Sequence, residues 1–416
     1  MTEATHPIRT TPARPPVPAQ PTERSSAGSA EDRMARTALT WLAEPGNRAV
    51  WAMVRAAGAP ATLDRLLDGN IPDQSLRAAV AARQKGGDAR EVAEAALERA
   101  RRLGARIVVP ADDEWPVRVD DLATLELDTG GRINVDIRPP LCLWTRGPLS
   151  LREAFDRSVA VVGARAATPY GVHTTNDIAF GLAERGWTVV SGGAFGIDAA
   201  AHRAALAASG RTIAVLACGV DRPYPQGNAA LFEEIGRTGL LISEWPPGAD
   251  PLRHRFLIRN RVIAAATAGT VLVEAAARSG AVQTMSRVLA LNRTAMIVPG
   301  AVTSIMSVGC HEMLRNHPYS RLVTGVPHIL EEVGRIGEYL ADPPRGRNHP
   351  RDDLDEDSRL VLEAVPRRGA ASPDQVAAKA GLGLRTVLHR LSLLELAGLV
   401  LRRDDGFTLP RRAPTA

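Results

Sequence analysis

A glycine-rich turn at residues 191–196, with the sequence SGGAFG, is the first feature of the chain that could bind a ligand. The apolar residues 188–190 predict a short buried strand before the turn, and residues 197–206 predict a helix after it. Glycines let a backbone come close to a ligand, and the free N–H groups at the start of a helix attract anions. Nucleotides, sugar phosphates and nucleic acids could all accept hydrogen bonds from these N–H groups. A turn that binds no ligand and only joins a strand to a helix is an equal alternative.

An arginine-rich segment at residues 253–261, with the sequence RHRFLIRNR, carries four arginines and one aromatic residue. Arginine forks bind phosphate oxygens in pairs, and Phe256 could stack on an unpaired base, so the segment suits a single nucleic-acid strand. Side chains two residues apart on a helix cannot face the same groove. We therefore expect either Arg259 or Arg261 to be internal and paired with an acid. The candidate acids are Asp198 and Glu244.

Few residues of the chain suit catalysis. Asp198 and His202 are one helical turn apart and are predicted to cap and brace that helix, and no serine or cysteine lies in a nucleophile elbow. Glu274, at the end of a predicted strand, is the one candidate for hydrolysis at a ribose. Residues 163–165, Gly-Ala-Arg, stand where a dinucleotide-binding protein would carry GxGxxG. We predict no catalytic residue, no metal ion and no cofactor.

Apolar segments alternate with helical segments over residues 159–298. Strands that are apolar on both faces are typical of a parallel sheet covered on both sides, so the alternation predicts an α/β fold with a doubly wound parallel sheet. Ligands bind such sheets beyond the carboxyl ends of the strands, where the loops that contain Arg165, residues 191–196 and Glu274 should meet. The predicted strands are 159–162, 188–190, 212–216, 240–242, 270–273 and 295–298.

Composition and pattern divide the chain into five segments. Residues 1–34 are rich in Pro, Thr, Ser and Arg and are predicted to be disordered, whereas 35–105 show the pattern of a small helical (SAM/HhH-like) domain. Such domains sometimes bind DNA through backbone amides at their glycine hairpins, but we expect packing or protein contact here. Strand-like runs at 107–109 and 141–144 open the α/β domain, which we place at 106–340. A proline-rich, charged linker follows at 341–357, and a compact unit at 358–412.

The segment 358–412 predicts three helices followed by a hairpin, which is the pattern of a winged helix. Its third helix carries Arg385, His389 and Arg390, which could contact DNA. Winged helices also serve as protein-binding modules, and the adjoining linker is acidic, so the two roles remain equal alternatives.

The 416 residues, of which 45% are hydrophobic, are enough for two or three folded domains. The formal net charge is +5, with Lys85 and Lys379 as the only lysines, and this mildly favours a polyanionic partner. The three cysteines are far apart, without a CxxC pair, and suit a reducing compartment. No apolar run reaches the length of a membrane span, so we predict a cytoplasmic protein without a membrane contact.

Seven ordered motifs resemble those of the DprA/Smf family of DNA-processing proteins. The motifs are GAR with YG at 170–171, SGGAFGID with AH at 201–202, TIAVLACGVD with YP at 224–225, SE at 243–244, FLIRNRVIAA, VLVEA with Ser279, Gly280 and Thr284, and VPG with SVGC at 307–310. One position and one three-residue segment depart from the family pattern: Ala164 replaces the usual serine of Gly-Ser-Arg, and residues 281–283 are less polar than usual.

The resemblance implies an extended Rossmann-like fold that binds single-stranded DNA without being an enzyme, during transformation or recombination. It further implies a homodimer that helps to load the RecA recombinase onto single strands. We carry the DNA pocket of the family over to Arg165, the 191–196 turn, Arg253 and Phe256, with Ser279 and Gly280 nearby. The complete set of predicted DNA-binding residues is Arg165, Ser191, Gly192, Gly193, Gly196, Arg253, Phe256, Arg259, Arg261, Ser279 and Gly280.

The alternative is a Rossmann nucleotide-binding enzyme such as a nucleoside monophosphate phosphoribohydrolase. These enzymes carry a PGGxGTxxE pattern that is absent from this chain. The arginines of 253–261 also exceed what one mononucleotide needs. Release of free base from nucleoside monophosphates, set against binding of oligo-dT, would separate the two functions.

Overall fold

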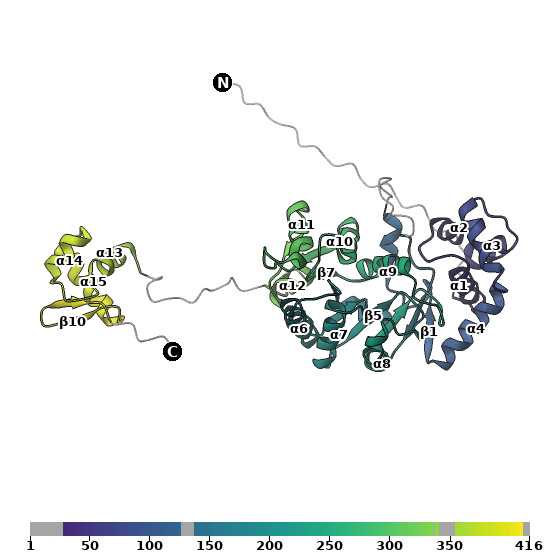
Figure 1. Cartoon of the computed structure of the whole chain (residues 1–416), viewed down its shortest axis with the longest axis horizontal. Coiled ribbons are helices and arrows are strands. Elements are labelled where there is room, and N and C mark those ends of the chain that lie inside the picture. Colours follow the sequence, from purple (N-terminus) through teal and green to yellow (C-terminus); the bar gives the residue numbers. More distant parts are fainter. Residues whose placement is uncertain (1–27, 126–136, 336, 341–353, 411–416) are drawn as a thin grey trace, which may run out of the picture. The chain divides into compact units, whose positions relative to one another are not determined.

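The computed structural model describes residues 28–125, 137–335, 337–340 and 354–410 (Figure 1). They form two compact units that divide near residue 341. The first unit joins four N-terminal helices to a large sheet covered by helices. The N-terminal helices are α1 (Ala30–Leu42), α2 (Arg48–Leu67), α3 (Gln74–Gln84) and α4 (Ala89–Arg102).

The N-terminal helices begin at polar capping residues, as helix starts require. Ser29 accepts a hydrogen bond from the Asp32 N–H at 3.1 Å, so α1 begins at Ala30. Arg33 of this helix pairs with Asp112, with 2.5 Å between Nη2 and Oδ1. The prediction of a disordered tail up to residue 34 is therefore wrong for residues 28–34, because a cap and a distant ion pair hold them; residues 1–27 lie outside the described residues.

The sheet has nine strands in the order β1-β2-β6-β5-β4-β3-β7-β8-β9. All pairs from β6 to β9 are parallel, while β2 pairs antiparallel with both β1 and β6. The fold is thus the predicted doubly wound sheet, extended by an antiparallel hairpin at one edge. The strands are β1 (Ala105–Val108), β2 (Leu143–Arg146), β3 (Ser158–Val162), β4 (Thr188–Ser191), β5 (Thr212–Leu216), β6 (Leu240–Ser243), β7 (Gly269–Leu272), β8 (Thr294–Ile297) and β9 (Arg321–Leu322).

Each of the predicted strands is present, with ends that differ by at most one residue from those expected. The strand-like run at 107–109 overlaps β1, and the run at 141–144 overlaps β2. The sequence pattern did not predict β9, because this edge strand has only two residues and both are exposed.

Helices cover both faces of the sheet because successive strand residues point to opposite faces. In β3, Ala160 and Val162 pack on one side and Val159 and Val161 on the other. The first face carries α5 (Leu151–Asp156), α9 (Arg253–Ala266), α10 (Gly280–Ala290) and α11 (Val308–Asn316). The second face carries α6 (Pro169–Glu184), α7 (Ile197–Ala207), α8 (Ala229–Thr238) and α12 (Val326–Val333).

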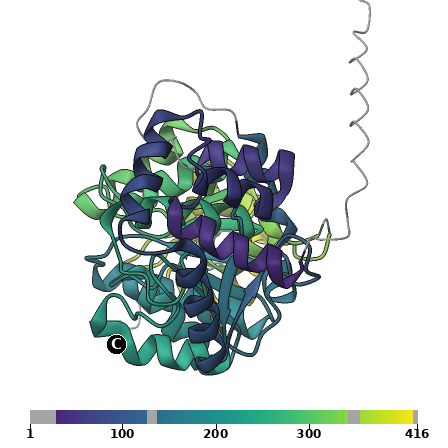
Figure 2. The ribbon, with the colours of Figure 1, turned by 90° about the vertical axis from the view of Figure 1, so that its right-hand side faces the viewer.

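The N-terminal helices cover the end of the sheet that carries β1, as Figure 2 shows from that side. α4 packs on β1, and Trp144 of β2 lies in the shared core. Short 3-10 helices occur at Val117–Thr124, Gln226–Asn228 and Ile305–Ser307. No helix in the described parts of the chain is both long and apolar enough to cross a membrane.

The second unit is a winged helix. It contains α13 (Glu356–Ala364), α14 (Pro373–Ala380), α15 (Leu384–Leu396) and the antiparallel strands β10 (Leu401–Arg403) and β11 (Gly406–Thr408). Ser372 and Gln375 form a capping box at the start of α14, and Gly381 ends that helix with a φ of 68°. Most of the predicted linker lies outside the described residues; its last two, Glu356 and Asp357, belong to α13 because Asp355 caps that helix.

Candidate nucleic-acid interface

The strand order reverses between β3 and β7. The chain passes from β3 to β4, β5 and β6, and then returns to place β7 on the opposite side of β3. The loops after β3 and β7 therefore diverge, and they leave a crevice beyond the carboxyl ends of these strands, which is where open α/β sheets bind ligands. Arg165 follows β3, the 191–196 turn follows β4, and Ser279 and Gly280 follow β7.

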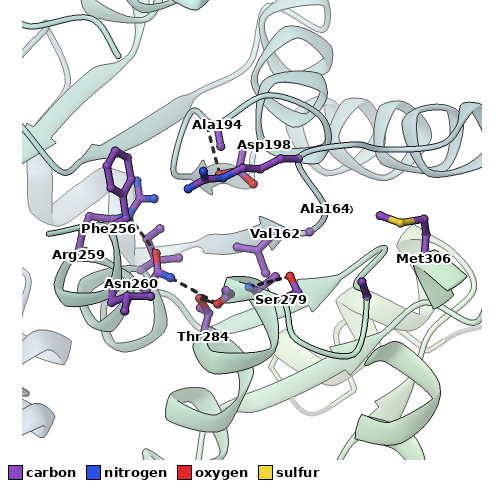
Figure 3. Close-up of a pocket in the computed structure, with 17 residues that line it drawn as sticks. Val162, Ala164, Ala194, Asp198, Phe256, Arg259, Asn260, Ser279, Thr284 and Met306 are labelled. Carbon is purple, nitrogen blue, oxygen red and sulfur yellow. Dashed lines mark hydrogen bonds between the residues drawn. The ribbon is translucent and has the colours of Figure 1, made fainter. Parts of the chain in front are cut away.

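A pocket of ≈ 330 Å³ fills this crevice. Figure 3 shows Phe256, Arg259 and Asn260 on one side of the pocket and Met306 on the other, with Val162 at the end of β3 between them. The first two turns of α9 thus lie on one side of the pocket and the 3-10 helix Ile305–Ser307 on the other. The start of α10 lies beside α9, where Asn260 Nδ2 donates to the Gly280 carbonyl at 3.5 Å. The remaining lining residues are Gly163, Ala164, Arg165, Ala194, Asp198, Leu257, Ile263, Ala276, Ser279, Gly280, Ala281 and Thr284.

Phe256 lies at the centre of an aromatic and cationic cluster. The Arg165 guanidinium carbon is 5.6 Å from the Phe256 ring centroid, and that of Arg259 is 6.0 Å from it. The Tyr224 ring lies 5.5 Å from the Phe256 ring at 52°. Phe256 is half-buried, whereas Arg165 is exposed, so part of the ring and the guanidinium face the solvent together. This combination suits a base beside its phosphate.

Two further predicted residues, Arg253 and Gly280, are exposed at the same rim. Arg253 is the first residue of α9, and neither it nor Arg165 forms an ion pair among the described residues. Ser279 caps α10 by accepting a hydrogen bond from the Ala281 N–H at 3.2 Å. The structure therefore brings Arg165 and Phe256 together with the start of α10 at the pocket, and Arg253 lies one helical turn before Phe256 on α9.

The anion position of the glycine turn is filled from inside the protein. The Gly192 N–H donates to Asp198 Oδ2 at 3.1 Å, and the Ala194 N–H donates to the same oxygen at 3.4 Å. Burial raises the pKa of Asp198, while Arg259 and these N–H groups oppose the shift. The donors that we expected to meet a ligand phosphate are thus already bound to a carboxylate.

Three of the predicted turn residues do not reach the surface. Ser191 is buried and donates its hydroxyl to the Val161 carbonyl at 2.6 Å. A Cβ on Gly192 would collide with the Arg259 guanidinium, and one on Gly193 would collide with Phe232. Direct DNA contact by Ser191, Gly192 and Gly193 is therefore wrong as a prediction, because the protein itself occupies the space beside them. Gly196, with a φ of 78°, is partly exposed and packs on the backbone of Arg165.

Three of the four arginines of 253–261 are internal. Arg261 is completely buried, and its two Nη atoms each lie 2.6 Å from an oxygen of Glu244. The predicted DNA contact of Arg261 is wrong, since this residue is the internal partner of Glu244 instead. Arg259 is buried at the edge of the pocket and donates to the Gly192 carbonyl at 2.9 Å. Burial lowers the pKa of Arg259 to about 10, and Asp198 opposes this shift.

Glu274 and His202, which we considered for catalysis, are buried and form hydrogen bonds inside the protein. Glu274 is 2% exposed and accepts hydrogen bonds from the Thr168 N–H at 2.9 Å and the Thr168 hydroxyl at 2.5 Å. Its carboxylate thereby holds the cap of α6. His202 is fully buried beside the Thr212 hydroxyl, and burial lowers its pKa to about 3. Among the described residues no three His, Cys, Asp or Glu side chains are grouped to hold a metal ion.

Two exposed residues at this rim were not predicted from the sequence. Phe195, in the middle of the glycine turn, is 51% exposed, and Arg278 is exposed directly before Ser279. The position of Phe195 in the sequence could have indicated its exposure, because Phe195 is a large aromatic residue between Ala194 and Gly196 in a turn that has no apolar core of its own. Tyr224, whose ring contacts Phe256, is likewise 45% exposed.

Comparisons with known proteins bear on the family of the chain. The profile of the family described as DNA recombination-mediator protein A matches residues 106–334, and that of the DprA winged helix domain matches residues 345–406. The chain is 46% identical over 376 residues to a putative DNA processing protein DprA of Mycobacterium tuberculosis, covering 90% of this chain and 93% of the relative. The chain belongs to the DprA/Smf family.

Two more DprA/Smf proteins extend the comparison. Protein Smf of Synechocystis is 33% identical over 304 residues, covering 66% of this chain and 75% of that protein. The X-ray structure of DNA processing protein A from Streptococcus pneumoniae aligns with a TM-score of 0.56 at 28% identity, covering 73% of this chain and 95% of that one. The family is one of recombination mediators, and it includes both the α/β domain and the winged helix of this chain.

Proposed function

We propose that this protein binds single-stranded DNA along the rim of the switch-point pocket and is not itself an enzyme. The observation that carries the proposal is Phe256, which is half-buried at the pocket with the guanidinium carbons of Arg165 and Arg259 at 5.6 Å and 6.0 Å from its ring centroid. An aromatic ring stacks on any base, and exposed arginines bind any phosphate, so such a rim holds a strand without reading its sequence. The proposed contacts are Arg165, Gly196, Arg253, Phe256, Ser279 and Gly280, to which we add Phe195 and Arg278.

The proposed role of this binding is to load RecA recombinase onto single strands in the cytoplasm. The family profile describes recombination mediators, and the resemblance of the motifs names RecA as the partner. Few aromatic side chains lie at the rim, so most bases of a bound strand would remain free for a filament-forming protein. A homodimer would place two rims on one strand and gain avidity without new contacts.

The nucleotide-cleaving alternative has no observation in its favour at this site. Asp198 occupies the position where the turn would hold a nucleotide phosphate, and Glu274 is bound to Thr168. A wild-type preparation should release no free base from nucleoside monophosphates. Release at a rate proportional to enzyme concentration would reverse this assignment.

A band-shift titration of oligo-dT and of duplex DNA over a salt series tests the binding. We expect tighter binding of the single strand, with the logarithm of the binding constant falling linearly with the logarithm of salt concentration. Equal affinity for the duplex would contradict the proposal. A RecA ATPase assay on strands covered by single-strand-binding protein tests the loading, and no acceleration by the wild-type protein would leave it a binder without a mediator role.

A further inference from the structure

The first turn of α9 lacks a cap of its own. Its N-cap residue is Leu252, and no side chain caps the helix start. Yet this turn carries Arg253 and Phe256, two of the proposed DNA contacts. Something outside the helix must therefore fix its direction if these side chains are to meet a strand in one geometry.

Glu44 supplies the missing support from the N-terminal helices. It lies in the turn between α1 and α2, and its carboxylate accepts hydrogen bonds from Arg255 Nη2 at 2.8 Å and from Trp245 Nε1 at 2.9 Å. Arg255 Nε lies 3.1 Å from Glu44 Oε2, so the guanidinium fork meets both carboxylate oxygens. Arg83 of α3 also donates to Glu44, at 3.2 Å.

The donors of this carboxylate are adjacent to the DNA contacts. Arg255 lies between Arg253 and Phe256 in the same turn, and its guanidinium carbon is 5.4 Å from the centroid of the buried Trp245. Phe256 packs against the small core of Ala217, Trp245 and Ile258. Burial alone would raise the pKa of Glu44, but the hydrogen bonds from Arg255 lower it, so the carboxylate is charged at neutral pH.

We infer that Glu44 is a positioning residue for DNA binding: through Arg255 and Trp245 it fixes the first turn of α9 so that Arg253 and Phe256 face the strand. This inference rests on the proposed function. It also gives the N-terminal helices a role in the site without any contact to DNA. The separation of Glu44 and Arg255 by 211 residues makes the link invisible in the sequence.

The sign of one substitution separates positioning from simple charge. Glu44 is an acid beside a rim that binds a polyanion, so by charge alone Glu44→Gln should strengthen the binding of oligo-dT. If Glu44 positions α9, the same change should raise the Kd by about three- to thirtyfold, in the range typical of residues coupled in one network. Glu44→Asp keeps the charge but withdraws the carboxylate by one methylene group, so it should also raise the Kd.

A matched control is Asp250→Asn. Asp250 is exposed, three residues before α9, and its side chain lies 3.8 Å from Arg222 rather than on Arg255. Arg255 contacts only its backbone carbonyl, which the substitution retains. Removing this acid should leave the Kd unchanged or lower it.

Introducing Glu44→Gln into an Arg253→Ala/Phe256→Ala protein tests whether Glu44 acts on DNA binding through Arg253 and Phe256. Positioning predicts that Glu44→Gln no longer weakens binding once both contacts are gone, whereas a general loss of folded protein would weaken it equally in either background. Circular dichroism checks that each variant is folded, and Glu44→Asp replaces Glu44→Gln if the latter is not.

The outcomes separate this inference from the function on which it rests. If the wild-type protein fails to bind oligo-dT, the proposed function itself is wrong. If the wild type binds and Glu44→Gln binds as tightly or more tightly, with Glu44→Asp unchanged, the positioning role is overturned and DNA binding stands.

Discussion

The rim of the site and the layer directly beneath it both contain arginines, but the rim arginines are exposed and the arginines of the lower layer are buried. Arg165 and Arg253 on the rim are exposed and have no ion-pair partner among the described residues. Beneath them, Arg259 and Arg261 are buried, with acceptors on the glycine turn and on Glu244. An arginine-rich segment is therefore not by itself a DNA surface, because a buried cation must be satisfied by the protein while an exposed one remains available to a ligand.

The glycine turn shows the same division. Its N–H groups bind the internal carboxylate of Asp198, and only Ala194, Phe195 and Gly196 reach the surface. The lower layer supports the rim, and the rim carries the DNA contacts that we propose.

The largest expected effect is on stability, from the lower layer. Arg261→Ala leaves Glu244 buried without its partner, so the free energy of unfolding should fall by about 3–5 kcal/mol. Urea unfolding of the variant and of Arg253→Ala measures the contrast, since the exposed Arg253 should cost less than about 0.5 kcal/mol. If the two substitutions lowered the free energy of unfolding equally, the rim and the lower layer would not differ in their contribution to stability.

The second effect is a pH dependence of stability from His202. The folded state holds its pKa at about 3, below the ordinary value of 6.5, so the unfolded chain binds a proton that the folded chain does not. Stability is therefore fully present above about pH 6.5 and is lost as the pH falls towards 3, by about 2 kcal/mol at pH 5. Unfolding at pH 7.5 and 5 should show this loss in the wild type and a smaller loss in His202→Gln. An equal loss of stability in both proteins would mean that groups other than His202 cause it.

The third effect belongs to the rim. Phe256→Ala should weaken oligo-dT binding by about 1–3 kcal/mol with little change in the salt slope, because stacking on a base carries no charge. The stability of the variant, measured alongside, should change less than its affinity. A variant that unfolds would instead make Phe256 a residue of the small core with Trp245.

The fourth effect is on the salt dependence. Arg165→Ala or Arg253→Ala should weaken binding of every sequence alike and reduce the salt slope by about 0.7 for each phosphate of a single strand that the variant no longer neutralises. Arg102→Ala, which removes an exposed arginine at the end of α4, serves as the comparison for net charge. A slope unchanged by both rim substitutions would remove these arginines from the interface.

The smallest effect is expected from the winged helix. A chain that ends at residue 340 retains the whole rim, so it should keep most of its affinity for oligo-dT. Of the basic residues on the third helix, Arg390 pairs with Asp355 at 2.9 Å, whereas Arg385 and His389 are exposed beside the exposed Leu384 and Leu388. If the folded truncation loses binding, Arg385 and His389 become the leading candidates.

Much of the fold could be predicted from local pattern. Apolar runs at 159–162 and 212–216 had to become strands buried on both faces, and the hairpin after α15 followed from Asp404, Asp405 and Gly406. The edge strand β9 and the ordered start of α1 could not be predicted, because two exposed residues carry no pattern and Arg33 depends on Asp112, 79 residues away.

By itself the sequence determined the family, the order of the strands along the chain and the residue types that gather at their carboxyl ends. Only the tertiary structure decided which of those residues face outward. Exposure depends on the neighbour that each residue meets, and the deciding neighbours can be far away along the chain. Glu44 lies 211 residues from Arg255, and Gly192 lies 67 residues from Arg259. Residue type determines which groups a side chain can bind, but burial decides whether it binds a ligand or another part of the protein.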